Sequence, residues 1–260
     1  MIPPPELFNF HRSTNLGEEM KLYSAWYCPF AQRAWIALLN KEIDFEYVEV
    51  DPYHKSDWWL EVSRGEAMVP MIFQAGNSAE EYTILDSNRI LEYLDDLYPL
   101  QKPLFSANPN QRAEQKYWMD HVDNRVVPYF YRYLKEYELG SVQDEDRDKM
   151  LAGLISLTEA MHSVGPYFSG HEIGAVDISM IPFAYRVKVL MEHYRNLNLP
   201  INGETSNRYH RWYKAMIETS AFAATSTDHT DYRDKLVAFY LPYSGGGGQS
   251  DVTDFRVSNF

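Results

Sequence analysis

The chain has 260 residues, 45% of them hydrophobic, which is enough for two domains that each bury a core. Its formal net charge of -13 at pH 7 would repel a phosphate backbone or an anionic lipid surface, so we expect no nucleic acid partner and no membrane partner. The single cysteine excludes an intrachain disulfide.

The first twenty residues lack the basic start and the apolar run of a secretory signal. The most apolar stretch, residues 26–39, is interrupted by Gln32 and Arg33, well short of the ~20 residues that a membrane helix needs. A single cysteine is also typical of a reducing compartment. We therefore predict a cytoplasmic protein in which residues 1–20 form an N-terminal extension.

The first hundred residues contain strand and helix patterns in alternation. Four short segments have the apolar or alternating character of strands: 21–28, 44–51, 68–73 and 82–85. Three segments have helical spacing: 29–41, 54–63 and 86–99. Pro29 and Ser56 suit the starts of the first two helices, and Pro99 ends the third. The predicted order is βαβαββα, within a first domain at 21–98.

The pattern becomes purely helical after residues 99–110, which carry three prolines and no period and therefore predict a linker. The helical segments that follow are 111–139, 145–164, 175–194, 206–220 and 231–241. We expect Pro128 to kink the first of them. The predictions are an all-helical domain at 111–242 and a flexible glycine-rich tail at 243–260.

Cys28 lies directly before Pro29, where the first strand is expected to lead into a helix. The unpaired N–H groups and the dipole of a helix N-terminus favour a thiolate there. The structural alternative is a small buried hydrophobe, and position alone does not separate the two. In "CPFA", however, Ala31 stands where a dithiol protein keeps its second thiol. If Cys28 performs disulfide chemistry, its partner comes from solution, and glutathione is the abundant candidate.

Two further features fit a glutathione site. If the Val69–Pro70 bond is cis, the extended Val69 backbone can pair with the cysteinyl part of glutathione like an added strand, although a turn proline is a common alternative. Ser87, at the next predicted helix start, suits the γ-glutamyl carboxylate, and Asp86 suits the ammonium group. Asp and Ser are also ordinary capping residues.

The sequence resembles a cysteine-type glutathione transferase, most closely the omega class. The resemblance rests on "YCPFAQR", "HKSDWW" with "MVP", "LDSNRILEYLDDLYP", "GAVDISMIPFAYR", "RWYKAM" and "DYRDKLVAFYL", and covers residues 21–242. It implies an α+β thioredoxin-like domain followed by an all-α domain, which is the glutathione transferase fold, in a homodimer. "CPFAQRAWI" also resembles the plant lambda class, which is often monomeric.

The resemblance implies roles for individual residues. Cys28 forms the mixed disulfide with glutathione, Lys55 meets the glycyl carboxylate, and Phe30 lines the site. The expected glutathione-binding residues are Phe30, Lys55, Val69, Pro70, Asp86 and Ser87. Lys55 has a simpler reading as an exposed lysine without a specific role. The chain departs from the family at Gly174, where Ser or Thr is usual, so that the capping box is left to Asp177.

The acceptor pocket is expected among aromatic residues of the helical domain. The segment 111–139 carries more aromatic residues than one core-facing stripe needs, and from these we select Tyr129 and Tyr133. Trp212 matches a tryptophan that lines the omega pocket, although a buried aromatic on an amphipathic helix belongs to the core more often. Hydrophobic or aromatic electrophiles and glutathionyl adducts are the expected partners.

The leading hypothesis is a glutathione-dependent thiol reductase that acts on glutathionyl adducts or dehydroascorbate and has weak conjugating activity. The alternative is a non-catalytic ligandin, which binds aromatic or hydrophobic molecules on the same fold. A third hypothesis is a membrane-inserting protein that resembles the chloride intracellular channel family, which also carries "CPF". Gln32, Arg33 and the acidic charge argue against membrane insertion. Glutathione is the only expected co-substrate. The eight histidines are scattered and predict no metal site.

Overall fold

The computed structural model describes residues 20–53, 55–75, 81–135, 141–199, 203–226 and 232–247. The chain divides into two units, Met1–Pro103 and Leu104–Phe260, called here the first unit and the second unit. The division lies inside the segment 99–110. Within the described residues, no helix is both long enough and apolar enough to cross a membrane.

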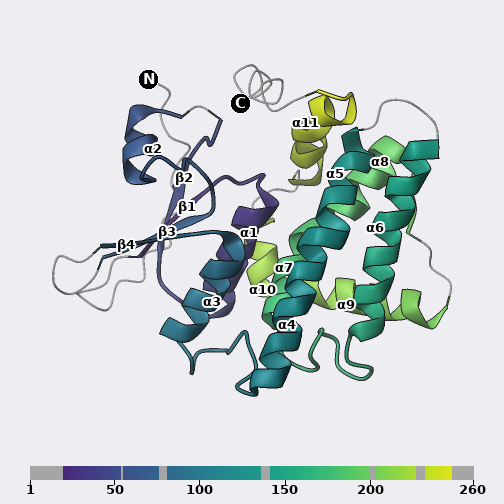
Figure 1. Ribbon diagram of the computed structural model, residues 1–260, viewed down its shortest axis with the longest axis horizontal. Helices are drawn as coiled ribbons and strands as arrows, with labels where there is room; N and C mark the ends of the chain where they lie inside the picture. The colour runs from purple at the N-terminus through teal and green to yellow at the C-terminus, as the bar shows by residue number, and fades with distance from the viewer. Residues whose placement is uncertain are drawn as a thin grey trace. The chain divides into compact units, whose positions relative to one another are not determined.

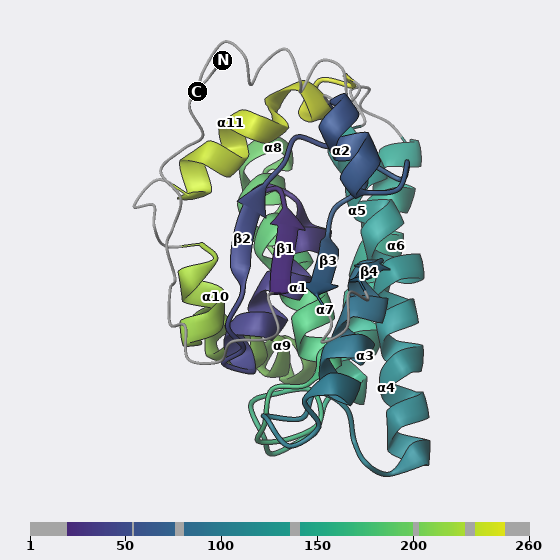
Figure 2. The ribbon, with the colours of Figure 1, turned by 90° about the vertical axis from the view of Figure 1, so that its left-hand side faces the viewer.

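The first unit contains a four-stranded sheet. Its elements are β1 (Met20–Ser24), α1 (Pro29–Asn40), β2 (Glu46–Glu49), α2 (Asp57–Val62), β3 (Met71–Ala75), β4 (Glu81–Leu85) and α3 (Ser87–Leu97). The strand order is β2-β1-β3-β4 (Figure 2), with β1 parallel to β2 and the other two pairings antiparallel. The predicted order βαβαββα and the β3–β4 hairpin are confirmed.

The sheet of the first unit is covered on both faces (Figure 1), with α2 on one face and with α1 and α3 on the other. Tyr23 and Met71 pack with Trp59 of α2 in one cluster. Their strand neighbours Leu22 and Ile72 are paired in register, are fully buried, and point to the opposite face, as the two-residue period of a strand requires.

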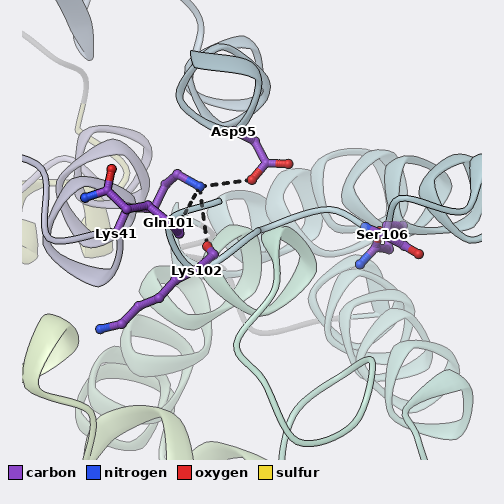
Figure 3. Close-up of polar contacts among 6 residues, drawn as sticks. Lys41, Asp95, Gln101, Lys102 and Ser106 are labelled. Carbon is purple, nitrogen blue, oxygen red and sulfur yellow. Dashed lines mark hydrogen bonds and ion pairs between the residues drawn. The ribbon is translucent and has the colours of Figure 1, made fainter. Parts of the chain in front are cut away.

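The helices α1 and α3 are joined at their C-terminal ends by a buried ion pair. Lys41, the C-cap of α1, is 0% exposed, and its Nζ lies 3.0 Å from Oδ1 of Asp95 in α3. The same ammonium donates to the carbonyl oxygens of Gln101 at 2.8 Å and of Lys102 at 3.3 Å (Figure 3). Because all three partners are oxygen atoms, the buried cation is well compensated. This bridge fixes the end of α1 against α3 and against the chain that follows α3.

The described residues of the second unit are helical, apart from the loops and one isolated bridge between Tyr167 and Gly170. The elements are α4 (Pro109–His121), η1 (Val122–Val126), α5 (Val127–Lys135), α6 (Ser141–Ala160), α7 (Ala175–Arg186), η2 (Val187–Met191), α8 (Glu192–Arg195), α9 (Glu204–Ile217), α10 (Ser220–Ala224) and α11 (Tyr232–Ser244). The predicted all-helical character is confirmed.

The predicted long helix at 111–139 is a rod of α4 and α5, joined by the π-helical turn η1 (Figure 1). Pro128 follows η1 by two residues and has no N–H to donate to the preceding turn. The π-helical turn therefore forms where the α-helical hydrogen-bond ladder is interrupted. The predicted end of this helix, 136–139, lies outside the described residues. The short helix α10 was not predicted.

Several predicted boundaries differ from the observed ones by a few residues, among them three at the first strand and at the two ends of the domains. The first strand ends at Ser24 rather than at Cys28, because a turn begins at Ala25. Met20, assigned to the N-terminal extension, belongs to β1, and residues 1–19 lie outside the described residues. Helix α11 continues through Tyr243 and Ser244, and the tail from residue 248 onward also lies outside the described residues.

Candidate functional site

Cys28 is the N-cap residue of α1. Its backbone is extended, with φ -78° and ψ 117°, and its Sγ accepts a hydrogen bond from the Ala31 N–H at 3.5 Å. Pro29 occupies the first helical position, where no N–H is needed. The side chain is half-buried and forms no disulfide. A sulfur atom that accepts a bond at a helix N-terminus is stabilised most when it is ionised.

The loop that carries Cys28 is held from two sides. The Cys28 N–H donates to the Ala25 carbonyl at 2.9 Å, which closes a turn between β1 and α1. The Trp26 N–H lies 3.2 Å from both carboxylate oxygens of Glu49, at the end of β2. Because β2 pairs with β1 in the sheet, these contacts fix the position of the thiol relative to the sheet.

The peptide bond between Val69 and Pro70 is cis, which was the condition for pairing of the Val69 backbone with glutathione. The half-buried Val69 side chain packs against the cluster that contains Trp59 and Met71. Val69 lies two residues before the start of β3, whose strand pairing begins at Met71. Val69 therefore stands at the end of a sheet strand but outside its ladder, where an extended peptide can pair with it.

Asp86 and Ser87 form the start of α3. Asp86 is its exposed N-cap, and its Oδ1 accepts the N–H groups of Asn88 at 3.0 Å and Arg89 at 3.1 Å. Its backbone lies at φ 70° and ψ 124°, a region that side-chain-bearing residues rarely adopt. Such strain is concentrated at ligand-binding positions. Ser87 is buried in the first helical turn, where N–H groups lack intrahelical partners and suit an anion.

Arg33 connects two residues of the predicted site, although the sequence pattern does not single it out. Its side chain is 0% exposed, and its Nη1 donates to Oγ of Ser87 at 3.2 Å and to Oδ1 of Asn88 at 3.4 Å. The guanidinium carbon lies 5.1 Å from the ring centroid of Phe30, which is half-buried. The available signal was a polar pair, Gln32 and Arg33, inside an apolar helix, because buried polar groups need tertiary partners.

Lys55 is the predicted site residue with the least structural support. It is exposed, on the segment that leads into α2, two residues before the first helical residue. Within the described part of the chain, no contact joins Lys55 to Cys28 or to Ser87. Its simpler reading, as an exposed lysine without a specific role, agrees with this position.

Tyr129 and Tyr133, predicted to line an acceptor pocket, lie on α5 in the second unit. Tyr129 is half-buried, and its ring centroid lies 4.4 Å from the Arg132 guanidinium and 5.6 Å from the Lys149 ammonium. Tyr133 is buried, and burial raises the pKa of its hydroxyl above the ordinary value. Both rings thus contribute to the packing around α5 and α6.

Trp212 is a core residue of the second unit. It is fully buried, and its indole N–H donates to Oδ1 of Asp177 at 2.8 Å. Asp177 also accepts the N–H groups of Phe168 at 2.7 Å and Gly174 at 2.9 Å, which confirms that it caps α7 from inside the helix. Burial raises the pKa of Asp177 to about 6, and these three donors oppose that shift. The position of Trp212 agrees with a residue of the hydrophobic core rather than with one that lines a pocket.

Comparison with known proteins identifies the family. The family model of the glutathione S-transferase N-terminal domain matches residues 22–103. Glutathione S-transferase U25 of Arabidopsis thaliana is 30% identical over 171 residues, which cover 65% of this chain and 72% of the relative. The chain therefore belongs to the glutathione transferase family, and the predicted family and fold are confirmed.

Relatives of different class names match at similar identity. The probable glutathione S-transferase DHAR1, cytosolic, of Oryza sativa subsp. japonica is 26% identical over 215 residues, 83% of this chain and 89% of the relative. The crystal structure of glutathione transferase Omega 3C from Trametes versicolor has 28% sequence identity and a TM-score of 0.72, and the match covers 90% of this chain and 92% of that one. The omega class remains a prediction.

Proposed function

We propose that this protein is a glutathione-dependent thiol reductase of the omega-like kind, in which Cys28 forms a mixed disulfide with glutathione. The observation that carries the proposal is the N-cap position of the only cysteine, whose Sγ accepts the Ala31 N–H at 3.5 Å. This bond and the helix dipole favour the thiolate, which is the form that attacks a disulfide.

The reaction takes two exchange steps. The Cys28 thiolate attacks the glutathione sulfur of a glutathionyl adduct, a Cys28–glutathione disulfide forms, and the substrate thiol leaves as its thiolate. A second glutathione thiolate attacks the mixed disulfide, which releases oxidised glutathione and restores the Cys28 thiolate. Over both steps, one free glutathione is consumed, the adduct supplies the other half of the oxidised glutathione, and the substrate leaves as its thiol. No second protein thiol is required, in agreement with the single cysteine.

The binding roles follow the functional groups of glutathione. The α3 N-terminus with Ser87 takes the γ-glutamyl carboxylate, and the Asp86 carboxylate takes the ammonium group. The Val69 backbone, next to Pro70, pairs with the cysteinyl peptide group, Phe30 lines the site, and Lys55 meets the glycyl carboxylate. Two solved relatives, a rice transferase and a bacterial maleylacetoacetate isomerase, are described as complexes with glutathione.

The acceptors in this proposal are glutathionyl adducts of hydrophobic or aromatic molecules and dehydroascorbate. Support comes from relatives named DHAR, of which one is called cytosolic and two are called chloroplastic. A cytoplasmic location and a homodimer complete the proposal. Light scattering on purified protein tests the dimer.

The decisive experiment is a steady-state assay with 2-hydroxyethyl disulfide and with dehydroascorbate, each in the presence of glutathione. Turnover by the wild type, lost in Cys28→Ser, supports the reductase. Tight binding of an aromatic dye without turnover of either substrate would support the ligandin instead.

A further inference from the structure

A buried guanidinium lies beneath the proposed glutathione site. Arg33 is 0% exposed, although removing a charged side chain from water is costly unless its surroundings compensate for it. Its position is the second turn of α1, five residues after Cys28. Arg33 also lies next to a proposed anion site. A buried cation at this position suggests a function in ligand binding as well as in packing.

Arg33 joins the two helices that carry the proposed site. Cys28 caps α1 and Asp86 caps α3, so the two N-termini supply the sulfur contact and the γ-glutamyl contact. The Arg33 Nη1 reaches the first turn of α3, at 3.2 Å from Ser87 Oγ and 3.4 Å from Asn88 Oδ1. One side chain therefore links Ser87 directly to α1.

The donor character of arginine also orients the Ser87 hydroxyl. A guanidinium only donates hydrogen bonds, so Ser87 Oγ must accept from it, and the hydroxyl proton must point to another acceptor. A carboxylate that docks on the α3 N-terminus offers such an acceptor. In addition, the guanidinium places a positive charge behind this position, and its interaction with an anion is strengthened by burial.

We infer that Arg33 is a positioning residue for the γ-glutamyl carboxylate of glutathione: it holds Ser87 in place as a hydrogen-bond donor and supplies a buried positive charge. The inference depends on the proposed function. It assigns Arg33 to the recognition of one carboxylate, so its effect is confined to ligands that carry that group.

Lys41 provides a matched control. Like Arg33, it is a cation packed with α1 that has 0% exposure and bridges to α3, but it does so through Asp95 at the opposite ends of the two helices. If Arg33 only fastened α1 to α3, Lys41→Met would affect glutathione binding as Arg33→Met does. Lys41→Met should reduce stability and leave the affinity for glutathione unchanged.

The test is calorimetry on the full chain with two peptides. One is glutathione, and the other is 4-aminobutyryl-cysteinyl-glycine, which keeps the amine and lacks the α-carboxylate. Arg33→Met should weaken glutathione binding about tenfold or more, the usual effect of losing a charge-assisted contact, and should change binding of the analogue little. In kinetics, the KM for glutathione should rise while kcat stays constant, because uniform binding is lost. Arg33→Lys should fall between wild type and Arg33→Met, since lysine keeps the charge but not the geometry.

Several results would overturn the inference. One is an equal loss of affinity for glutathione and for the analogue in Arg33→Met. Another is an equal loss of glutathione affinity in Arg33→Met and in Lys41→Met. The third is an unchanged glutathione affinity in Arg33→Met. If Arg33→Met does not fold, Arg33→Lys decides: its preference for glutathione over the analogue must be smaller than that of the wild type. A wild type that binds neither peptide would overturn the proposed function as well, which separates that failure from failure of the inference alone.

Discussion

The buried Asp177 should make the stability of the second unit depend on pH, and Asp177→Asn should remove this dependence. The pKa of Asp177 is raised from the ordinary 3.8 to about 6, chiefly because its carboxyl group is fully buried. The folded state therefore holds this proton more firmly than the unfolded chain does. The contribution of Asp177 to the free energy of unfolding is complete below about pH 4 and is lost as the pH rises through 6.

The size of this effect follows from the difference between the two pKa values. A difference of about two pH units corresponds to about 3 kcal/mol of unfolding free energy. In Asp177→Asn, the side-chain amide keeps an oxygen for the N–H groups of Phe168 and Trp212, but its nitrogen faces the N–H of Gly174. The loss of that bond costs about 1 to 3 kcal/mol, a cost that does not vary with pH because an amide does not titrate.

The assay is urea unfolding, followed by tryptophan fluorescence between about pH 4 and pH 7. The other carboxylates titrate alike in both proteins, so the difference between wild type and Asp177→Asn isolates this group. The stability advantage of the wild type should shrink by about 3 kcal/mol as the pH rises. A constant difference would show that Asp177 does not titrate in this range. An advantage that grows with pH would show that the three N–H donors outweigh burial, and would refute the reasoning.

Three further predictions concern the proposed site. Iodoacetamide should label Cys28 with a midpoint below that of free cysteine, about pH 8.5, and a midpoint at or above that value would contradict the proposed attack. Asp86→Ala and Ser87→Ala should each weaken glutathione binding about tenfold to a hundredfold by calorimetry, without moving that midpoint; unchanged affinity in both would remove the γ-glutamyl assignment. Cys28→Ser should abolish disulfide reduction, keep glutathione binding, and raise conjugation of 1-chloro-2,4-dinitrobenzene, because the hydroxyl and the helix N-terminus can stabilise the glutathione thiolate; reductase turnover that persists in this variant would exclude the mechanism.

The sequence predicts the elements of the first unit well where the signals are local. The apolar run before Cys28 and the proline after it predict a strand followed by a helix, and Ser56 caps α2 as expected, at 3.2 Å from the Trp59 N–H. These signals work because capping and periodicity act over a few residues. Local patterns also predict the order of strands and helices, and this order places Cys28 and Ser87 at the N-termini of two helices.

Other features depend on contacts between distant residues and are not visible in a local pattern. Arg33 meets Ser87 across 54 residues of sequence, and nothing near Arg33 indicates that partner. The positive φ of Asp86 runs against its intrinsic preference and is imposed by the surrounding fold. Trp212 matched a pocket residue by resemblance, but its hydrogen bond to Asp177 is a tertiary contact.

The central claim is that Cys28 exchanges disulfides with glutathione, and intact-mass spectrometry tests it most directly. Wild-type protein and Cys28→Ser are incubated with oxidised glutathione and then measured with and without a reductant. The wild type should gain the mass of one glutathionyl group, which the reductant removes, and the variant should gain none. A wild type that gains no mass, although it is folded and binds glutathione, would contradict the proposed mechanism.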